Sequence, residues 1–502
     1  MLRPLAARAP LVLLLTACTG DDGGDAGDGT ATTGAATTGG TTTAAATSGA
    51  SQGSTGAEST SGTTADSATA TGTSTTSPTS TTSPTSTTAA TATTADTTDS
   101  GTTGAADPPT VLLPKQGLDP DEVAVLVNTS DPNSVAIAAY YVEHRGVPQG
   151  NVVELAFPTD AVLSAAAFAP HKAQVDALDP SIQALVITWT KPYRVDCMSI
   201  TSAFALGFDV KYCSQPCNPT APSPYYDSLS VAPFTDHGIR PAMSIAAANL
   251  DDALALIDRG IAADDTFPTG DGVLVRTTDV ARSVRWDDFI YTVDTWKHPE
   301  GLALEYIDNS GGMGSDFVTG AQDLLFYFTG LAQVPEIDKN TYRPGAVADH
   351  LTSYGGQIPD SGQMSVVRWL EAGVTASYGT VVEPCNYPTK FPRTSVLLPH
   401  YFRGATVLEA YWKSVAWPGE GIFVGEPLAR PWGATTTDWQ DGTLTITTTL
   451  LRPGVAYVVE AGESDQGPWT PALQDISIPA HQRLEIVVEP ALAPFYRLRE
   501  QG

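Results

Sequence analysis

The chain has 502 residues, with 55 acidic against 26 basic side chains and a formal net charge of −29. This acidic excess argues against a surface that binds phosphate backbones, so we expect no nucleic-acid partner. After the first residues no apolar run of 18 residues occurs, which argues against a membrane-spanning helix.

The first 18 residues have the layout of an export signal, with two arginines, an apolar run at 11–15 and small residues before Cys18. Its last four residues, LTAC, resemble the lipobox of bacterial lipoproteins, whose cysteine is lipidated and becomes the mature N-terminus. We therefore expect a signal peptide at 1–18 and a lipid anchor on Cys18, in the cell envelope of a Gram-negative bacterium, at the outer membrane or the surface. An ordinary signal peptide with a chance cysteine is the alternative.

Residues 19–107 consist mainly of Thr, Ser, Ala, Gly and Asp, and contain no aromatic residue, lysine or arginine. Such a segment lacks the apolar surface that offsets the entropy of ordering, so it is predicted to be a disordered stalk. As a flexible coil it would span on the order of 50 Å.

Local signals predict alternating strands and helices from 108 to 435. Residues 122–128 (EVAVLVN) form a buried-strand pattern. Asp131 and Pro132 then predict the start of a helix, which Gly146 and Pro148 end. Further strands are predicted at 151–155, 183–189, 272–276, 324–328, 346–348 and 374–377, and further helices at 250–257, 281–296, 365–372 and 405–415. This alternation is typical of an α/β fold with a parallel sheet, or of two such subdomains side by side.

Residues 436–502 change to short strand patterns without helices between them, such as TLTITTTL, VAYVVEAG and LEIVVEP. We predict a small all-β sandwich there.

Several blocks of the sequence carry a family resemblance. VNTSDPNSVAIAAYYVEHRGVPQGNVVEL, ALVITWTKPYRV, EPCNYPTKFP and FVGEPLARPW resemble an uncharacterised family of exported bacterial proteins from species with exosortase-type sorting systems. RPAMSIAAANLDDALALIDRGI and GATVLEAYW more distantly resemble gingipain-like cysteine peptidases of the caspase clan. This second resemblance implies a gingipain-like α/β domain.

The peptidase resemblance also implies a histidine after one strand and a cysteine after the next. By the appearance of the motifs, His350 and Cys385 form this catalytic dyad. If the flanking blocks are aligned instead, the cysteine position falls near Ser353, which becomes the alternative nucleophile. In that layout neither catalytic residue of the clan is present.

Residues at strand ends are further candidates for binding. Glu383 lies beside Cys385 in a polar strand exit, and Tyr193 and Arg194 follow the strand at 183–189, where parallel sheets place their sites. Arg194 is suited to bind a carboxylate.

Cys197, Cys213 and Cys217 lie in one insertion without a histidine. In an exported chain, cysteines in such an arrangement favour a disulfide over zinc, so we expect no metal. One cysteine of the three is left over, and it is free to pair with Cys385, which would remove the nucleophile.

The sequence thus leaves two functions open, without a cofactor. One is a cysteine-type hydrolase or peptidase that acts on a peptide or envelope substrate through Cys385 and His350. The other is a catalytically inactive relative that binds an envelope, exopolysaccharide or sorting-associated component. Whether the chain is an enzyme is undecided at this point.

Overall fold

The computed structural model describes residues 107–501 apart from 214–216 and 298–300. Cys18, the predicted signal peptide and nearly all of the predicted stalk lie outside these residues. All described residues belong to one compact unit of the chain.

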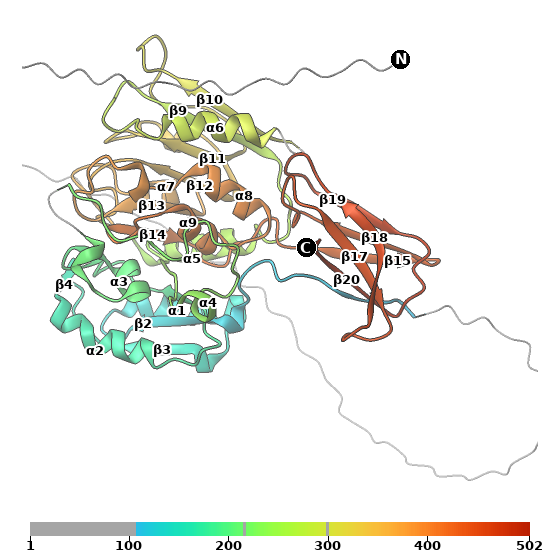
Figure 1. Ribbon diagram of the computed structural model, residues 1–502. Coiled ribbons are helices and arrows are strands. Elements are labelled where there is room, and N and C mark those ends of the chain that lie inside the picture. The colour runs from blue at the N-terminus through green and yellow to red at the C-terminus, as the bar shows by residue number, and fades with distance from the viewer. Residues whose placement is uncertain (1–106, 214–216, 298–300, 502) are drawn as a thin grey trace, which may run out of the picture. The chain divides into compact units, whose positions relative to one another are not determined.

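A ten-stranded sheet forms the centre of the α/β part (Figure 1). Its strands are β2 (Val123–Asn128), β3 (Val152–Leu155), β5 (Ala184–Ile187), β8 (Ala242–Ser244), β9 (Gly270–Arg276), β10 (Leu302–Asp308), β11 (Leu324–Thr329), β12 (Tyr342–His350), β13 (Ala376–Thr380) and β14 (Gly421–Gly425). They lie in the order β10-β9-β11-β12-β13-β14-β8-β5-β2-β3.

Two sets of parallel strands make up this sheet. The set β10-β9-β11-β12-β13 is parallel throughout, and so is the set β8-β5-β2-β3. Strand β14 lies between the two sets, runs antiparallel to β13 and meets β8 at the pair Val424 and Ser244. The predicted α/β class with a largely parallel sheet is therefore confirmed, and the two strand sets form one continuous sheet.

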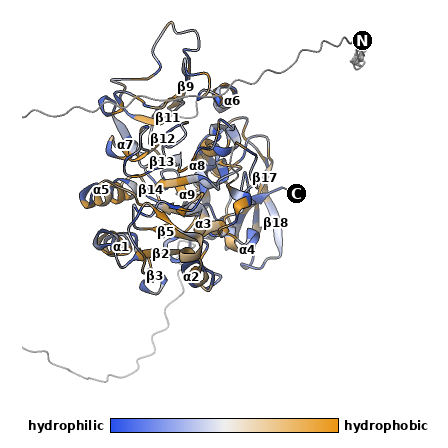
Figure 2. Ribbon diagram, turned by 90° about the vertical axis from the view of Figure 1, so that its left-hand side faces the viewer, coloured by the Kyte–Doolittle hydropathy of each residue, from blue (hydrophilic) through white to orange (hydrophobic). Residues whose placement is uncertain are grey.

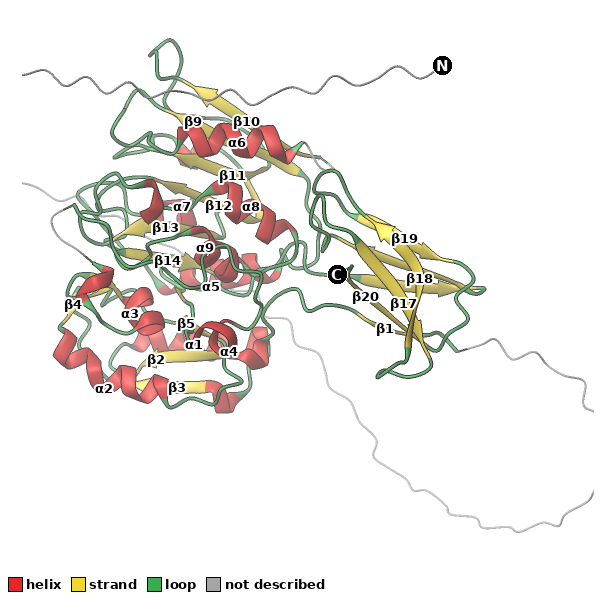
Figure 3. Ribbon diagram, viewed as in Figure 1, coloured by secondary structure: helices red, strands yellow, loops and turns green. Residues whose placement is uncertain are grey.

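Helices cover both faces of the sheet (Figure 3). They are α1 (Pro132–Arg145), α2 (Ala165–Asp176), α3 (Ile200–Leu206), α4 (Pro233–His237), α5 (Leu250–Ile261), α6 (Trp286–Trp296), α7 (Val367–Glu371), α8 (Thr394–Phe402) and α9 (Val407–Ser414). Five strands are buried along their whole length, as expected for a sheet covered on both faces: β2, β5, β11, β13 and β14. In Figure 2, which is coloured by hydropathy, orange marks the hydrophobic residues.

Alternate residues of one strand serve two separate cores. In β9, Leu274 belongs to the large core that also contains Phe289 of α6, whereas Val273 and Val275 belong to a second core with Trp369 of α7. This arrangement follows from the period of two in a strand, which sends neighbouring side chains to opposite faces.

Helix α1 begins and ends where its sequence predicts. The Asp131 carboxylate accepts a hydrogen bond from the backbone N–H of Asn133, and Gly146 closes the helix in the left-handed region at φ 67°. By contrast, the helix predicted at 281–296 begins only at Trp286. Ser283 Oγ accepts from the Thr277 backbone N–H at 2.9 Å, which holds the preceding residues in a turn instead.

The C-terminal part is an all-β module of two sheets, as predicted. One sheet has the order β1 (Thr110–Leu112), β20 (Phe495–Glu500), β17 (Tyr457–Gly462), β18 (Trp469–Ile476), and the other β15 (Thr436–Gln440), β16 (Thr443–Thr448), β19 (Leu484–Val488). Their shared core includes Ile446, Val459, Ile486 and Leu498. Strand β1 comes from the N-terminal side of the α/β part and pairs in parallel with β20.

A third, three-stranded sheet has the order β4 (Val162–Leu163), β6 (Arg194–Val195), β7 (Met198–Ser199). Within the described residues, no helix is both long and apolar enough to cross a membrane.

Candidate functional site

The carboxyl ends of β12 and β13 open on a cavity of ≈ 310 Å³, which we call the Cys385 cavity. Its walls combine the loops after β9, β12 and β13 with Cys217 of the insertion after α3. They consist of Cys217, Ala281, Arg282, Leu351, Thr352, Ser353, Glu383, Pro384, Cys385 and Asn386. The structure thus brings four of the predicted site residues, Cys217, Ser353, Glu383 and Cys385, to one place.

Cys385 has no free thiol here, because its sulfur is bonded to that of Cys217. The residue has a left-handed backbone with φ 57°, which costs free energy for a residue other than glycine. Glu383 stabilises this conformation, since its Oε1 accepts from the Cys385 backbone N–H at 2.8 Å. Glu383 therefore anchors the loop, and the nucleophile predicted at Cys385 is absent in this disulfide-bonded state.

His350 is not placed as a general base either. Its ring is buried, and Nδ1 accepts a hydrogen bond from Trp369 Nε1 at 2.9 Å. The other nitrogen, Nε2, therefore carries the proton and donates to the Met364 carbonyl at 3.1 Å. Burial lowers the pKa of His350 to about 4. The ring is thus neutral with both nitrogens engaged, and the structure does not assemble the predicted dyad with Cys385.

Ser353 lines the cavity, but its hydroxyl makes no hydrogen bond to any described residue. Its carbonyl accepts from the Thr380 hydroxyl at 3.1 Å, which fixes the backbone. The nearby Arg282 is held by Asp279 at 2.7 Å and by the Thr352 hydroxyl at 3.1 Å. A serine nucleophile needs an adjacent base, and no histidine lines this cavity.

Tyr193 and Arg194 lie away from the Cys385 cavity. Arg194 belongs to β6, where it pairs with Val162 of β4. Its Nε is buried without a hydrogen-bond partner in the described part of the chain. The sequence did not predict the short β4-β6-β7 sheet. Arg194 belongs to this separate sheet and is not part of the turn that directly follows β5.

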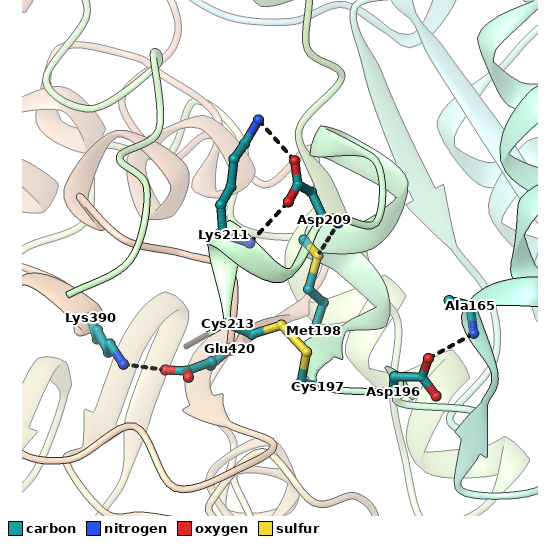
Figure 4. Close-up of a disulfide and its surroundings, with 9 residues drawn as sticks. All are labelled: Ala165, Asp196, Cys197, Met198, Asp209, Lys211, Cys213, Lys390 and Glu420. Carbon is teal, nitrogen blue, oxygen red and sulfur yellow. Dashed lines mark hydrogen bonds and ion pairs between the residues drawn. A yellow bond between two sulfur atoms is a disulfide. The ribbon is translucent and has the colours of Figure 1, made fainter. Parts of the chain in front are cut away.

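The other two cysteines of the insertion, Cys197 and Cys213, form a second disulfide (Figure 4). The expected disulfide chemistry of the insertion is therefore borne out, and the leftover cysteine is Cys217. Figure 4 also shows a buried ion pair close by, in which Lys390 Nζ lies 2.6 Å from Glu420 Oε2.

A second cavity of ≈ 360 Å³ opens at the carboxyl ends of β2, β5 and β8, and we call it the Asn133 cavity. Its polar residues are Ser130, Asp131, Asn133, Thr159, Thr188, Thr190, Lys191 and Asn249, and Pro359 reaches it from the loop after β12. Asp131 and Asn249 already cap α1 and α5. The side chains of Ser130, Asn133, Thr159 and Lys191 make no hydrogen bond within the described residues, which leaves them available to a ligand.

No protein-family model matches this chain, and no curated protein matches it. Two solved structures are similar to it. A complex of the pro- and mature domains of RgpB from Porphyromonas gingivalis shares 9% identity at a TM-score of 0.34, over 74% of this chain and 94% of that one. The arginine-specific cysteine proteinase gingipain R (RgpB) shares 9% identity at a TM-score of 0.33, over 76% of this chain and 94% of that one. Both structures are of gingipains, the peptidases that two blocks of this sequence distantly resemble.

The residues that decide the state of this site carry no local sequence signal. Neither the donor Trp369 nor Arg282 was singled out, and the Asn133 cavity was not predicted. Thr190 and Asn249 each follow a strand closely, so the rule that sites lie at carboxyl strand ends was the available signal for that cavity.

Proposed function

We propose that the chain is a lipid-anchored protein of the bacterial cell envelope whose α/β domain binds an envelope component without cleaving it. The observation that carries this proposal is the Cys217–Cys385 disulfide. It removes the thiolate that a cysteine hydrolase requires. The neutral, fully bonded ring of His350 supports the same conclusion.

The ligand fits the Asn133 cavity by its chemistry. Hydroxyl, amide and ammonium groups without a hydrogen-bond partner among the described residues line this cavity, together with the buried Trp189. Such groups bind a ligand rich in hydroxyls, which both donates and accepts hydrogen bonds. We therefore assign a saccharide of the envelope or of an exopolysaccharide as the ligand class.

A glycan array probed with the full-length protein, followed by calorimetric titration of the strongest hit, tests this assignment. The double variant Asn133→Ala/Thr159→Ala removes two unbonded polar groups and is expected to weaken binding about tenfold or more. The matched control Ser353→Ala alters the Cys385 cavity and should leave the affinity unchanged. A protein that binds no glycan, or a double variant that binds like the wild type, contradicts the assignment.

A cysteine hydrolase is the second candidate function. It is favoured by the left-handed backbone of Cys385, because strained residues cluster at active sites, and by the position of Cys385 at the carboxyl end of β13. A thiol reductant would have to cleave the bond to Cys217, and the reductant would itself be oxidised to a disulfide.

Peptide hydrolysis by the reduced protein, measured together with site-resolved alkylation between pH 4 and 9, decides this candidate. Activity that appears on reduction and disappears in Cys385→Ser supports a hydrolase. Retention of that activity in His350→Ala would show that another group is the base. No activity in either redox state leaves the binding function.

The anchor itself is tested by palmitate labelling. Wild-type protein is expected to be labelled and to sediment with the outer membrane, whereas Cys18→Ser should be unlabelled and soluble in the periplasm.

Association with exosortase-type sorting rests on the sequence resemblance. It predicts that processing of the chain changes in a host from which the exosortase gene has been deleted.

A further inference from the structure

A third cavity, of ≈ 170 Å³, is distinct from both strand-end cavities, and we call it the basic cavity. Its charged lining residues are four cations and one anion, namely Lys115, Arg403, Lys413, Arg452 and Glu500. This balance is the reverse of that of the whole chain, which has 55 acidic and 26 basic side chains.

Two of the four cations already have carboxylate partners. Lys115 pairs with Glu122. Arg452 Nη2 lies 2.7 Å from both carboxylate oxygens of Glu500. These two cations are therefore largely neutralised by the protein itself.

Arg403 and Lys413 differ from them, because neither has a carboxylate within 4.0 Å among the described residues. Arg403 Nη2 donates to His400 Nδ1 at 3.1 Å, and Lys413 Nζ donates to the Ser230 carbonyl at 2.8 Å. His400 Nε2 then carries the ring proton and donates to Asp227 at 3.1 Å, so His400 contributes no positive charge.

The nearby carboxylate of Glu409 is engaged elsewhere, since it accepts from the backbone of Leu118 at 3.1 Å and of Thr406 at 2.9 Å. Burial lowers the pKa of Arg403 to about 10 and also lowers the pKa of Lys413. Both cations are therefore held in a poorly solvated place without a counter-ion in contact, where an anion interacts strongly.

We propose that the basic cavity binds one small oxyanion, a carboxylate or a phosphate, between the guanidinium of Arg403 and the ammonium of Lys413. A guanidinium offers several N–H donors in a plane that matches either group, and the lysine adds a compact charge. Leu229, Val231 and Leu450 supply the apolar part of its walls. The cavity of ≈ 170 Å³ leaves room for the oxyanion and a few further atoms.

Calorimetric titration of the full-length protein with inorganic phosphate and with acetate, against chloride at equal ionic strength, tests the proposal. We expect saturable binding of one equivalent of at least one oxyanion. Arg403→Gln should weaken it about tenfold or more, because it removes a charged donor. Arg368→Gln, which alters an arginine on α7 outside the cavity, should bind like the wild type.

A second variant keeps the test independent of the stability of Arg403→Gln. Leu229 is 55% exposed, so Leu229→Trp is expected to fold, to fill the cavity and to weaken binding by a similar factor. The control Leu229→Ala should leave the affinity within about twofold of the wild-type value. The proposal is overturned if neither oxyanion binds better than chloride, or if Leu229→Trp binds like the wild type. Glycan binding at the Asn133 cavity is independent of either outcome.

Discussion

Trp369 Nε1 donates a hydrogen bond to His350 Nδ1 over 2.9 Å, and this contact fixes which nitrogen of the ring carries the proton. The bond joins the end of β12 to α7 in the second core. It makes the histidine part of the interior, so its titration is linked to folding.

The stability of the protein should therefore depend on pH through His350. Its pKa in the folded state is about 4, below the ordinary value of 6.5, so the unfolded chain binds more protons between these values. The contribution is fully present above pH 6.5 and is lost as the pH falls toward 4, by up to about 3 kcal/mol. Urea unfolding at pH 7 and pH 5 should show a smaller difference for His350→Phe than for the wild type.

The control for this prediction is His144→Gln, because His144 is exposed on α1. Its difference between the two pH values should equal that of the wild type. An unchanged difference in His350→Phe would show that His350 is not linked to folding in this way.

The buried pair of Lys390 and Glu420 should be costly to break from one side. Each side chain is 1% exposed, and burial raises the pKa of Glu420 to about 7. Lys390→Met leaves a buried carboxyl without its partner and should lower the free energy of unfolding by about 3–5 kcal/mol at pH 8. The loss should be smaller at pH 5.5. At that pH Glu420, with its raised pKa, is protonated, so the variant buries a neutral carboxyl group and not an unpaired charge.

A double-mutant cycle with Lys390→Met and Glu420→Leu measures this coupling. The double variant should be more stable than Lys390→Met alone. For comparison, Lys339→Met breaks an exposed pair with Asp338 and should change stability by less than about 1 kcal/mol. If Lys390→Met and Lys339→Met lowered the free energy of unfolding equally, burial would not be what makes the Lys390–Glu420 pair costly to break.

The two disulfides should differ in what they contribute. The Cys217–Cys385 bond joins residues 168 positions apart, whereas the Cys197–Cys213 bond joins residues 16 apart. In the chain-entropy description, the longer loop contributes about 5 kcal/mol and the shorter about 3 kcal/mol. Unfolding of Cys217→Ser/Cys385→Ser and of Cys197→Ser/Cys213→Ser under non-reducing conditions compares them.

A Cys217→Ser/Cys385→Ser variant as stable as the wild type would mean that this bond does not form in solution. Cys385 would then be a free thiol, and the hydrolase function would become the stronger of the two candidates.

Close packing of Gly356 and Gly379 holds the loop at 351–366, which contains Ser353, against β13. A Cβ at Gly379 would lie 2.6 Å from the Gly356 backbone nitrogen, which leaves no room for a side chain. Gly379→Ala should therefore displace the loop and lower the free energy of unfolding by about 2 kcal/mol or more. Gly362→Ala is the matched control in the same loop, since a Cβ there meets nothing within 4 Å. Equal stability of the two variants would contradict the packing argument.

Local signals predicted the elements whose ends are defined by neighbouring residues. Asp131, Pro132 and Gly146 lie next to the ends of α1, so a short window contains all that defines that helix. Helix α8 was missed because Pro399, inside it, is typical of a helix break. Strand β10 was also missed, and it lies at the edge of the sheet and is only half buried.

The site depended on contacts that no window contains. The sequence placed Cys385 in a polar strand exit, but its partner Cys217 lies 168 residues away, and three cysteines of the insertion were possible partners. His350 follows a strand like a catalytic histidine, yet Trp369 of another element decides its state. Residue type and spacing therefore identified the place of the Cys385 cavity but not the chemistry of its residues.

The pairing of β1 with β20 also determines where a mechanical load enters the fold. If the chain is tethered through Cys18, as proposed, tension reaches the described part at its first residues and meets β1 within three residues. The three residue pairs from Thr110 and Phe495 to Leu112 and Arg497 run in parallel, so a pull along β1 shears these contacts together rather than opening them one by one. The pairing of β1 with β20 would then bear the load first, before it reaches the sheet that forms the strand-end cavities.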